Sequence, residues 1–105
     1  MVIIVNTETI EGKEIIEVLG ICKGNTVRTR NFGSDIIAGL KNLAGGEVSQ
    51  YTSLLTKARE QATERMVAMA KEMGANAIVN VRYTTSNVMQ GCSEILAYGT
   101  AVKIK

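Results

Sequence analysis

The segment Ser49–Gly74, SQYTSLLTKAREQATERMVAMAKEMG, constrains the fold of this chain more than any other stretch. Its apolar residues recur every three or four positions, which predicts one amphipathic helix of about six turns. Gly74 stands where a left-handed residue would terminate that helix. Such a helix must bury its apolar stripe against the rest of the chain. The stripe contains Tyr51, Leu54, Leu55, Ala58, Ala62, Met66, Met69 and Met73.

Two residues of this segment do not fit a helix with a single buried side. Arg65 falls at the edge of the apolar stripe, and Val67 falls among the charged residues on the opposite side. An arginine at such a margin has to extend its head to water or pair with an acid. We therefore predict that the helix contacts something on more than one side, such as a neighbouring subunit.

The rest of the chain is rich in β-branched residues and interrupted by glycines, as expected of strands that pack on the helix. The predicted strands are Val2–Val5, Glu14–Cys22, Ala77–Thr85 and Glu94–Lys105. The last two are joined by a loop over SNVMQGCS and form an antiparallel pair if that loop makes a hairpin. Within the third strand, simple alternation places Ile78, Asn80 and Arg82 on one face and Val79, Val81 and Tyr83 on the other.

Glycines mark two positions in and after the second strand. Gly20 indicates a bulge or the close approach of another backbone. The pair Gly24-Asn25 is either a two-residue turn or an interruption within one strand that continues to Thr29. We favour the continuous strand, and the sequence leaves both alternatives open.

A shorter helix is predicted before the long one. Ser34 is a suitable N-cap, Asp35 follows it, and apolar residues at helical spacing continue to the break at Gly45-Gly46. The element order is therefore ββααββ, which favours an α+β fold with a mixed or antiparallel four-stranded sheet and helices on one face. Residues 1–105 are expected to form a single domain.

Composition removes several classes of function. The formal net charge of +2 is far below the basic excess of a dedicated nucleic-acid binder. The N-terminal apolar run, MVIIV, is too short for a signal peptide or a membrane span, so a cytoplasmic protein with reduced thiols is expected. The chain has no histidine, so an enzyme would have to rely on Asp, Glu, Lys, Tyr or Cys.

One polar cluster is a candidate ligand site. Arg28 and Arg30 are two residues apart, so an extended backbone places both on one face, and Asn31 and Asp35 follow. Two guanidinium groups just before a helix N-terminus could hold a carboxylate or a phosphate. The alternative is a structural role, as a salt bridge to Asp35 or a contact between subunits.

The cysteines Cys22 and Cys92 are the candidate metal ligands, because thiolates bind soft metals. Structural zinc sites use four closely spaced ligands, and this sequence has neither a CxxC motif nor a histidine. Cys22 lies in an apolar strand, where a free cysteine usually behaves as a small hydrophobic residue. A metal site built from these thiols would need ligands gathered from several chains.

Several segments resemble the YbjQ family, whose members are small prokaryotic proteins labelled as heavy-metal-binding. They are EGKEIIEVLG, RTRN with Asp35, GGEVSQYTSLLTKAREQATERM, MGANAIVNVRY and AYGTAVKI, in family order over nearly the whole chain. The resemblance implies a ββααββ fold assembled into a ring-like homo-oligomer, typically a pentamer. It implies a possible heavy-metal ligand and no established reaction.

Together these observations predict a non-enzymatic, cytoplasmic, homo-oligomeric binding module, with a heavy metal or a small anion as its ligand. The expected partner is the chain itself, without nucleic acid or membrane. The alternative is a small enzyme whose active site lies between subunits and uses Arg30, Asp35 and either Tyr51 or Tyr83.

Overall fold

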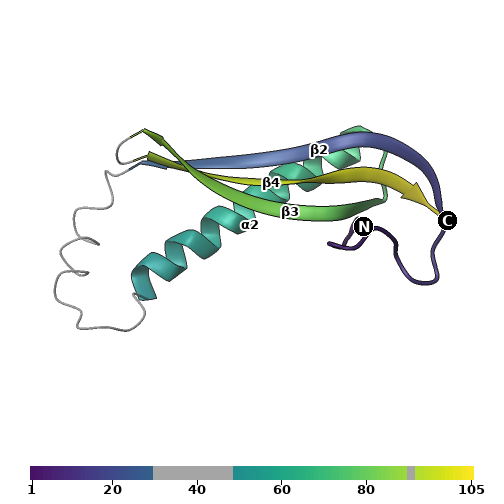
Figure 1. Ribbon diagram of the computed structural model, residues 1–105, viewed down its shortest axis with the longest axis horizontal. Helices are drawn as coiled ribbons and strands as arrows, with labels where there is room; N and C mark the ends of the chain where they lie inside the picture. Colours follow the sequence, from purple (N-terminus) through teal and green to yellow (C-terminus); the bar gives the residue numbers. More distant parts are fainter. Residues whose placement is uncertain (30–48, 90–91) are drawn as a thin grey trace.

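The computed structural model describes residues 1–29, 49–89 and 92–105. In this part of the chain one helix runs diagonally across one face of a four-stranded sheet, whose strand order is β1-β3-β4-β2 (Figure 1). The elements are β1 (Ile3–Ile4), β2 (Ile15–Thr29), α2 (Ser49–Glu72), β3 (Ala77–Met89) and β4 (Cys92–Ile104). The α+β class and the mixed sheet are confirmed. The predicted short helix falls on residues outside the described ranges.

Pairing within the sheet is parallel only between β1 and β3, where Ile3 lies opposite Ala77. Strand β4 pairs antiparallel with both β2 and β3. The predicted hairpin is confirmed, but the loop predicted over residues 86–93 is wrong, because pairing continues to Met89 opposite Cys92. The residues of this polar segment have low strand propensity, but backbone pairing with β4 holds the segment in the sheet.

Strand β2 is continuous through Gly24-Asn25, which lie opposite Ala97 and Leu96 of β4. The continuous strand is therefore confirmed and the turn is excluded. The glycine is needed because α2 approaches β2 here: a Cβ atom on Gly24 would collide with the backbone of Ala62 and Met66. Of the two alternatives predicted for Gly20, a bulge or a close backbone approach, the bulge is confirmed by a register shift between Val18 and Gly20.

The buried stripe of α2 consists of four residues spaced one turn apart: Ala58, Ala62, Met66 and Ala70, all fully buried. Three of them are alanines, so the helix can lie close to β2 and β4, on which it mainly packs. Met69 and Met73 are partly buried at the margin of this core. Leu55, predicted in the stripe, is 37% exposed.

The end of α2 has the geometry predicted from Gly74. Gly74 adopts φ 90°, which the glycine allows at no steric cost. Its N–H donates to the Lys71 carbonyl, and the N–H of Ala75 donates to the Ala70 carbonyl. These two hydrogen bonds form a Schellman motif, which satisfies the last carbonyls of the helix.

Arg65 and Val67 are both explained within one chain. Val67 is partly buried and packs against the core, so its assignment to the charged side of the helix is wrong. The Arg65 Nη1 atom donates a 2.6 Å hydrogen bond to the carbonyl of Asn25 on β2. Arg65 therefore contacts β2 and Val67 contacts the core, so neither residue needs a second subunit to explain its position.

Simple alternation in β3 is also wrong. Asn80 adopts φ 54°, and the register with β4 shifts between Val79 and Arg82. The extra residue brings Ile78 and Val81 into the same core beneath α2, while Val79 lies in a second cluster. A local bulge therefore changes which side chains share a face.

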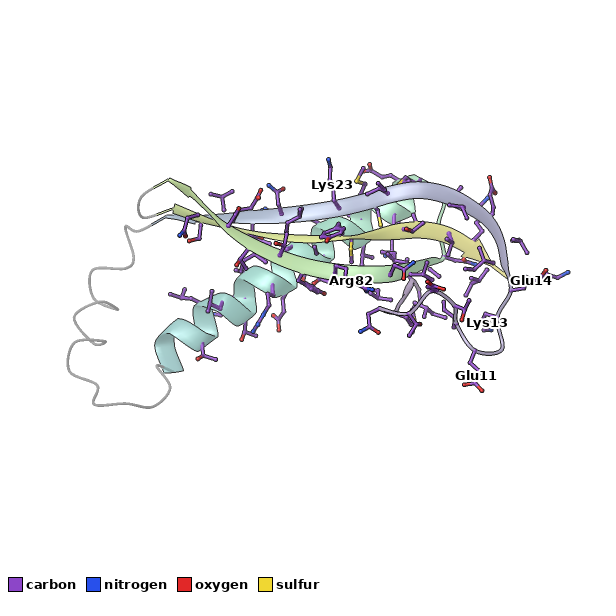
Figure 2. All side chains as sticks on the ribbon, in the orientation of Figure 1. Glu11, Lys13, Glu14, Lys23 and Arg82 are labelled. Carbon is purple, nitrogen blue, oxygen red and sulfur yellow. The ribbon has the colours of Figure 1, made fainter. Side chains whose placement is uncertain are left out.

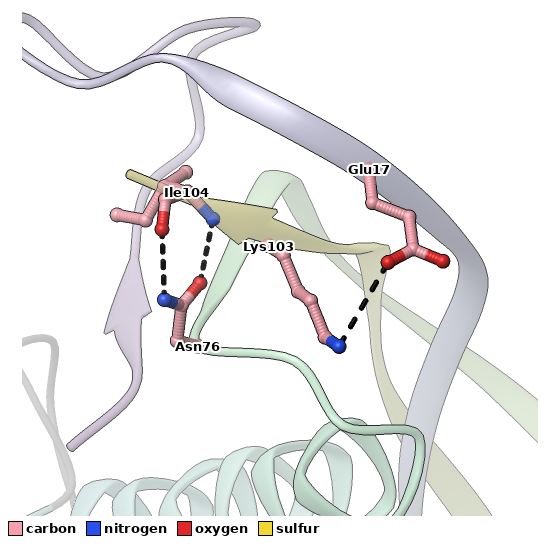
Figure 3. Close-up of polar contacts among 4 residues, drawn as sticks. All are labelled: Glu17, Asn76, Lys103 and Ile104. Carbon is pink, nitrogen blue, oxygen red and sulfur yellow. Dashed lines mark hydrogen bonds and ion pairs between the residues drawn. The ribbon is translucent and has the colours of Figure 1, made fainter.

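The second cluster covers one end of the sheet face opposite α2. Its buried members Ala77, Val79 and Val102 are packed by apolar residues of the N-terminal segment and of the strand ends. Asn76 anchors this end, because its side chain exchanges two hydrogen bonds with the backbone of Ile104, at 2.7 and 3.0 Å. Nearby, Lys103 and Glu17 form a 3.8 Å ion pair (Figure 3).

The N-terminal segment reaches only part of β3. The N–H groups of Asn80 and Val81 donate to the carbonyls of Thr7 and Val5. Beyond that point the sheet face opposite α2 is exposed. Within the described residues, no helix is long and apolar enough to cross a membrane.

Candidate functional site

We use the name open face for one part of the sheet surface. It lies on the face opposite α2, where the N-terminal segment leaves the strands uncovered. Registers place three side chains in one row across it: Lys23 and Arg82 each lie opposite Tyr98. Directly opposite residues share a face of the sheet, and the neighbours of Tyr98, Ala97 and Gly99, are buried on the α2 side. The row therefore places one aromatic ring between two cations.

Figure 2 shows Lys23 on β2 and Arg82 on β3, on either side of β4. The Arg82 Nη1 atom donates to the carbonyls of Asn6, at 2.9 Å, and of Val81, at 3.0 Å. These bonds hold the guanidinium at the border between the N-terminal segment and the open face. Its remaining N–H groups are not used in these two bonds.

The open face also exposes large apolar residues. Val18 is 66% exposed, Ile21 69% and Val27 48%, all on β2, while Tyr98 on β4 is 38% exposed. Among the described strand residues that lie in register across the open face, the one carboxylate belongs to Glu94, which lies opposite Val27. This carboxylate accepts a 2.9 Å hydrogen bond from the Asn25 side chain. Ligands that combine an apolar surface with negative charge suit such a face.

A concave surface lies between α2 and β3. It is a groove of about 510 Å³ lined by Thr56, Arg59, Glu60, Thr63, Glu64 and Tyr83. The Thr63 hydroxyl lies 2.8 Å from the Arg59 carbonyl and 2.8 Å from the Tyr83 hydroxyl. Because Thr63 donates to the carbonyl, Tyr83 donates to Thr63. The charges in this groove have mixed sign, so it does not select a ligand of one charge.

Cys22 is fully buried beneath α2. Its Sγ atom donates a 3.7 Å hydrogen bond to the carbonyl of Gly99. Burial raises the pKa of this thiol above its ordinary value of 9.0. Metals bind the thiolate, so a neutral, enclosed thiol is poorly suited as a ligand.

The two cysteines of one chain do not come together. Cys22 lies opposite Gly99, whereas Cys92 lies opposite Thr29 at the far end of the β2–β4 pair. At about 3.3 Å per residue of strand, roughly 23 Å of backbone separates them. A site that uses both cysteines would have to be shared between chains.

The other predicted site residues lie at the border of the described chain. The backbone of Arg28 pairs with Ser93 in the sheet. Arg30, Asn31 and Asp35 lie outside the described residues, so this ligand cluster stays a prediction.

A heavy-metal site is not supported by the rest of the described chain. In residues 1–29, 49–89 and 92–105, no group of three His, Cys, Asp or Glu side chains could hold a metal ion. Met66 is fully buried in the core, as predicted for a packing residue. Met69 uses its sulfur to accept a 3.4 Å hydrogen bond from the backbone N–H of Lys23.

Tyr98 and Lys23 were not identified from the sequence. The available signal was alternation in AYGTAV, which separates Tyr98 from its small neighbours Ala97 and Gly99. The row itself could not be predicted, since it depends on the registers of three strands and on the bulge at Asn80.

The fold and these surfaces define a class: a small α+β domain with a helix on one face of a mixed sheet and an open face opposite. The chain belongs to the YbjQ family, because the model of that family, described as "Putative heavy-metal-binding", matches residues 2–105. The resemblance inferred from the sequence segments is therefore confirmed.

Relatives cover nearly the whole chain. A "UPF0145 protein" from Halorubrum lacusprofundi is 56% identical over 100 residues, with 95% of this chain and 96% of the relative covered. One from Archaeoglobus fulgidus is 53% identical over 104 residues, with coverage of 99% and 96%. A crystal structure of a protein of unknown function from Pediococcus pentosaceus has the same fold, with a TM-score of 0.65, 16% identity and coverage of 99% and 98%.

Proposed function

We propose that this protein is a non-enzymatic, cytoplasmic binding module that works as a homo-oligomeric ring and takes a small anionic ligand. The observation that carries the assembly is the exposure of β2, which is an edge strand of the described sheet. Four of its large apolar side chains are exposed to solvent: Ile16, Val18, Ile21 and Val27. Long exposed edges with apolar side chains associate with other chains unless they are covered. A second copy of the chain is the proposed cover.

Two different edges support a ring rather than a symmetric dimer. The outer edge of β3 carries the N-terminal segment only as far as Val81. From Arg82 onward β3 has no neighbour on that side among the described strands. Contacts between two unlike edges are head-to-tail, and such contacts close into rings when the rotation permits. The family resemblance supports closure at five copies.

A small anion is favoured over a heavy metal as the ligand. The family description names a metal, but Cys22 is a buried neutral thiol and lies far from Cys92 along the sheet. Two cations on the open face, Lys23 and Arg82, provide positive charge that a small anion would match. Arg28 and Arg30 remain the predicted second source of positive charge.

The test of assembly is the molar mass in solution, measured by light scattering during size-exclusion chromatography at several concentrations. We expect about five times the 11.3 kDa mass of one chain. Ile21→Lys should reduce the mass, because it puts a charge into the proposed contact. Leu55→Lys is the matched control: Leu55 is also an exposed apolar residue, but it lies on α2. A wild-type protein that stays monomeric at every concentration would refute the proposed assembly.

The ligand part is tested on protein purified without an affinity tag. A specific metal site would fill to nearly stoichiometric occupancy during loading with Zn²⁺ or Cu⁺ in the presence of reductant. Because we propose that there is no such site, we expect less than about 0.1 metal ion per chain. Stoichiometric metal retained after gel filtration would favour the family description instead.

A further inference from the structure

We propose that the row formed by Lys23, Tyr98 and Arg82 binds a nucleoside phosphate, with the base stacked on Tyr98 and the phosphate held by the two cations. This inference rests on the proposed function, because it names the class of the small anionic ligand. The site belongs to one chain, but Lys23 lies beside Ile21 of the proposed contact between copies, so the molar mass is measured on the same samples as the affinity.

The geometry of the row suits a flat ring with a charged end. Neighbouring strands lie about 4.8 Å apart, so the Cα atoms of Lys23 and Arg82 are roughly 10 Å apart with Tyr98 midway between them. The Lys23 side chain is long enough to reach over the tyrosine ring, while the Arg82 guanidinium, held by the Asn6 carbonyl, lies at the N-terminal border of the row. A phosphate joined to a stacked base would lie within reach of both cations.

Tyr98 is placed as a stacking platform. It is 38% exposed at the centre of the open face, on the middle strand of β2, β4 and β3. The row beside it toward the hairpin contains Asn25, Leu96 and Thr84, none of which is charged. Bases stack on exposed aromatic rings of β-sheets regardless of base identity, because every base has a π-face.

The charges of the row are available for an anion. The Lys23 ammonium has no hydrogen-bond or ion-pair partner in the described part of the chain, whose one ion pair joins Lys103 and Glu17. Arg82 is held by the carbonyls of Asn6 and Val81, which leaves further N–H groups for a phosphate and reduces the ordering cost on binding. The guanidinium is therefore positioned before the ligand arrives.

Competing negative charge is distant from the row. Glu94 is four residues from Tyr98 along β4, or about 13 Å of extended strand, and its carboxylate is already bonded to Asn25. Face-to-face packing of two copies would instead bring identical cations together, and like charges across an interface are unfavourable. A small anion matches the row better than a second open face does.

The experiment is isothermal titration calorimetry, which measures the dissociation constants of three probes for the wild-type protein at low ionic strength: AMP, adenosine and inorganic phosphate. We expect AMP to bind at least about tenfold more tightly than either fragment, because stacking and charge act together. Two-dimensional NMR with the same probes should place the largest shifts at Lys23, Tyr98 and Arg82. Shifts centred on any other surface would overturn the assignment.

Variants separate stacking from charge. Tyr98→Leu should weaken AMP about tenfold and leave the affinity for phosphate unchanged. Lys23→Gln and Arg82→Gln should each weaken AMP and phosphate and leave the adenosine affinity unchanged. The matched controls are Tyr83→Leu, at the other exposed tyrosine of the described chain, which lines the α2–β3 groove, and Lys57→Gln, at an exposed lysine on α2. Both controls should bind AMP as the wild type does.

Several results would overturn the proposal. One is AMP that binds no more tightly than phosphate, which would leave an anion site without stacking. Another is a loss in Tyr83→Leu as large as that in Tyr98→Leu. A third is no AMP binding together with a lower molar mass for Lys23→Gln, which would mean that a second copy covers the row. The molar mass of each sample separates the two proposals: a ring without AMP binding refutes only the site, and a monomer that binds AMP refutes only the ring.

Discussion

The two faces of the sheet use their residues in opposite ways. Under α2 the strands present mostly small residues, among them Gly24, Ala97 and Ala101, all buried. On the open face the same strands expose Ile21 and Tyr98. A half-buried antiparallel sheet normally places its large apolar residues inside and polar residues outside. The inversion indicates that the closeness of α2 limits the size of the inner residues. We propose that the outer residues contact other molecules.

The largest expected effect comes from Gly24, where the inner face admits no side chain. Gly24→Ala places a Cβ against the backbone of Ala62 and Met66, so α2 must move away from β2. We expect a loss of about 4 kcal/mol in the free energy of unfolding, or no cooperative unfolding at all. Urea denaturation followed by circular dichroism measures it.

The control for this change is Gly12→Ala, because nothing lies within 4 Å of a Cβ at Gly12. Its positive φ of 78° should cost only about 1 kcal/mol. If the two variants lose equal stability, the closeness of α2 and β2 does not explain Gly24.

Deleting side chains on the two faces should give unequal losses. Met66→Ala leaves a cavity beneath α2, since Met66 is fully buried, and should cost about 3 kcal/mol. Ile21→Ala on the open face should cost less than about 0.5 kcal/mol when unfolding is measured at a concentration where the chain is monomeric. The same Ile21→Ala variant should lower the molar mass at high concentration. Equal losses for the two variants would remove the contrast between the faces.

The smallest effect concerns pH. Burial raises the pKa of the Cys22 thiol in the folded state above its unfolded value of 9.0. Between those two values the unfolded chain has released this proton and the folded chain has kept it, so the unfolded state is favoured as pH rises. The stability that the neutral thiol provides is therefore complete below pH 9.0 and is lost above it.

For a single thiol the loss is at most about 1.4 kcal/mol for each pH unit. Denaturation at pH 7, 8, 9 and 10 should show a steeper alkaline loss in the wild type than in Cys22→Ala. Parallel curves would show that Cys22 does not titrate differently in the two states.

Much of the fold could be predicted because its signals are local. The apolar period of α2 and the position of Gly74 are each set within a few neighbouring residues, and the structure agrees with both. The two errors in strand assignment have a common cause. The extra residue at Asn80 and the paired segment up to Met89 both depend on backbone pairing with β4, which the side chains of β3 by themselves do not reveal.

The candidate site was less predictable than the fold. Cys22 stood out as a soft ligand, but its neutrality results from burial beneath α2, which composition does not reveal. Tyr98 is one of three tyrosines and has no motif of its own. Its position between Lys23 and Arg82 exists only when three strands are in register.

The sequence by itself determined the α+β class, the long helix with its glycine end, the continuous β2 and membership of the YbjQ family, because these follow from periodicity, turn chemistry and segment similarity. Tertiary structure alone decided which residues share a face. A bulge at Asn80 exchanges the faces of β3, and the approach of α2 to Gly24 selects small residues on one side. Faces are set by long-range backbone pairing, so the open face and its Lys23–Tyr98–Arg82 row emerge only when the strands assemble.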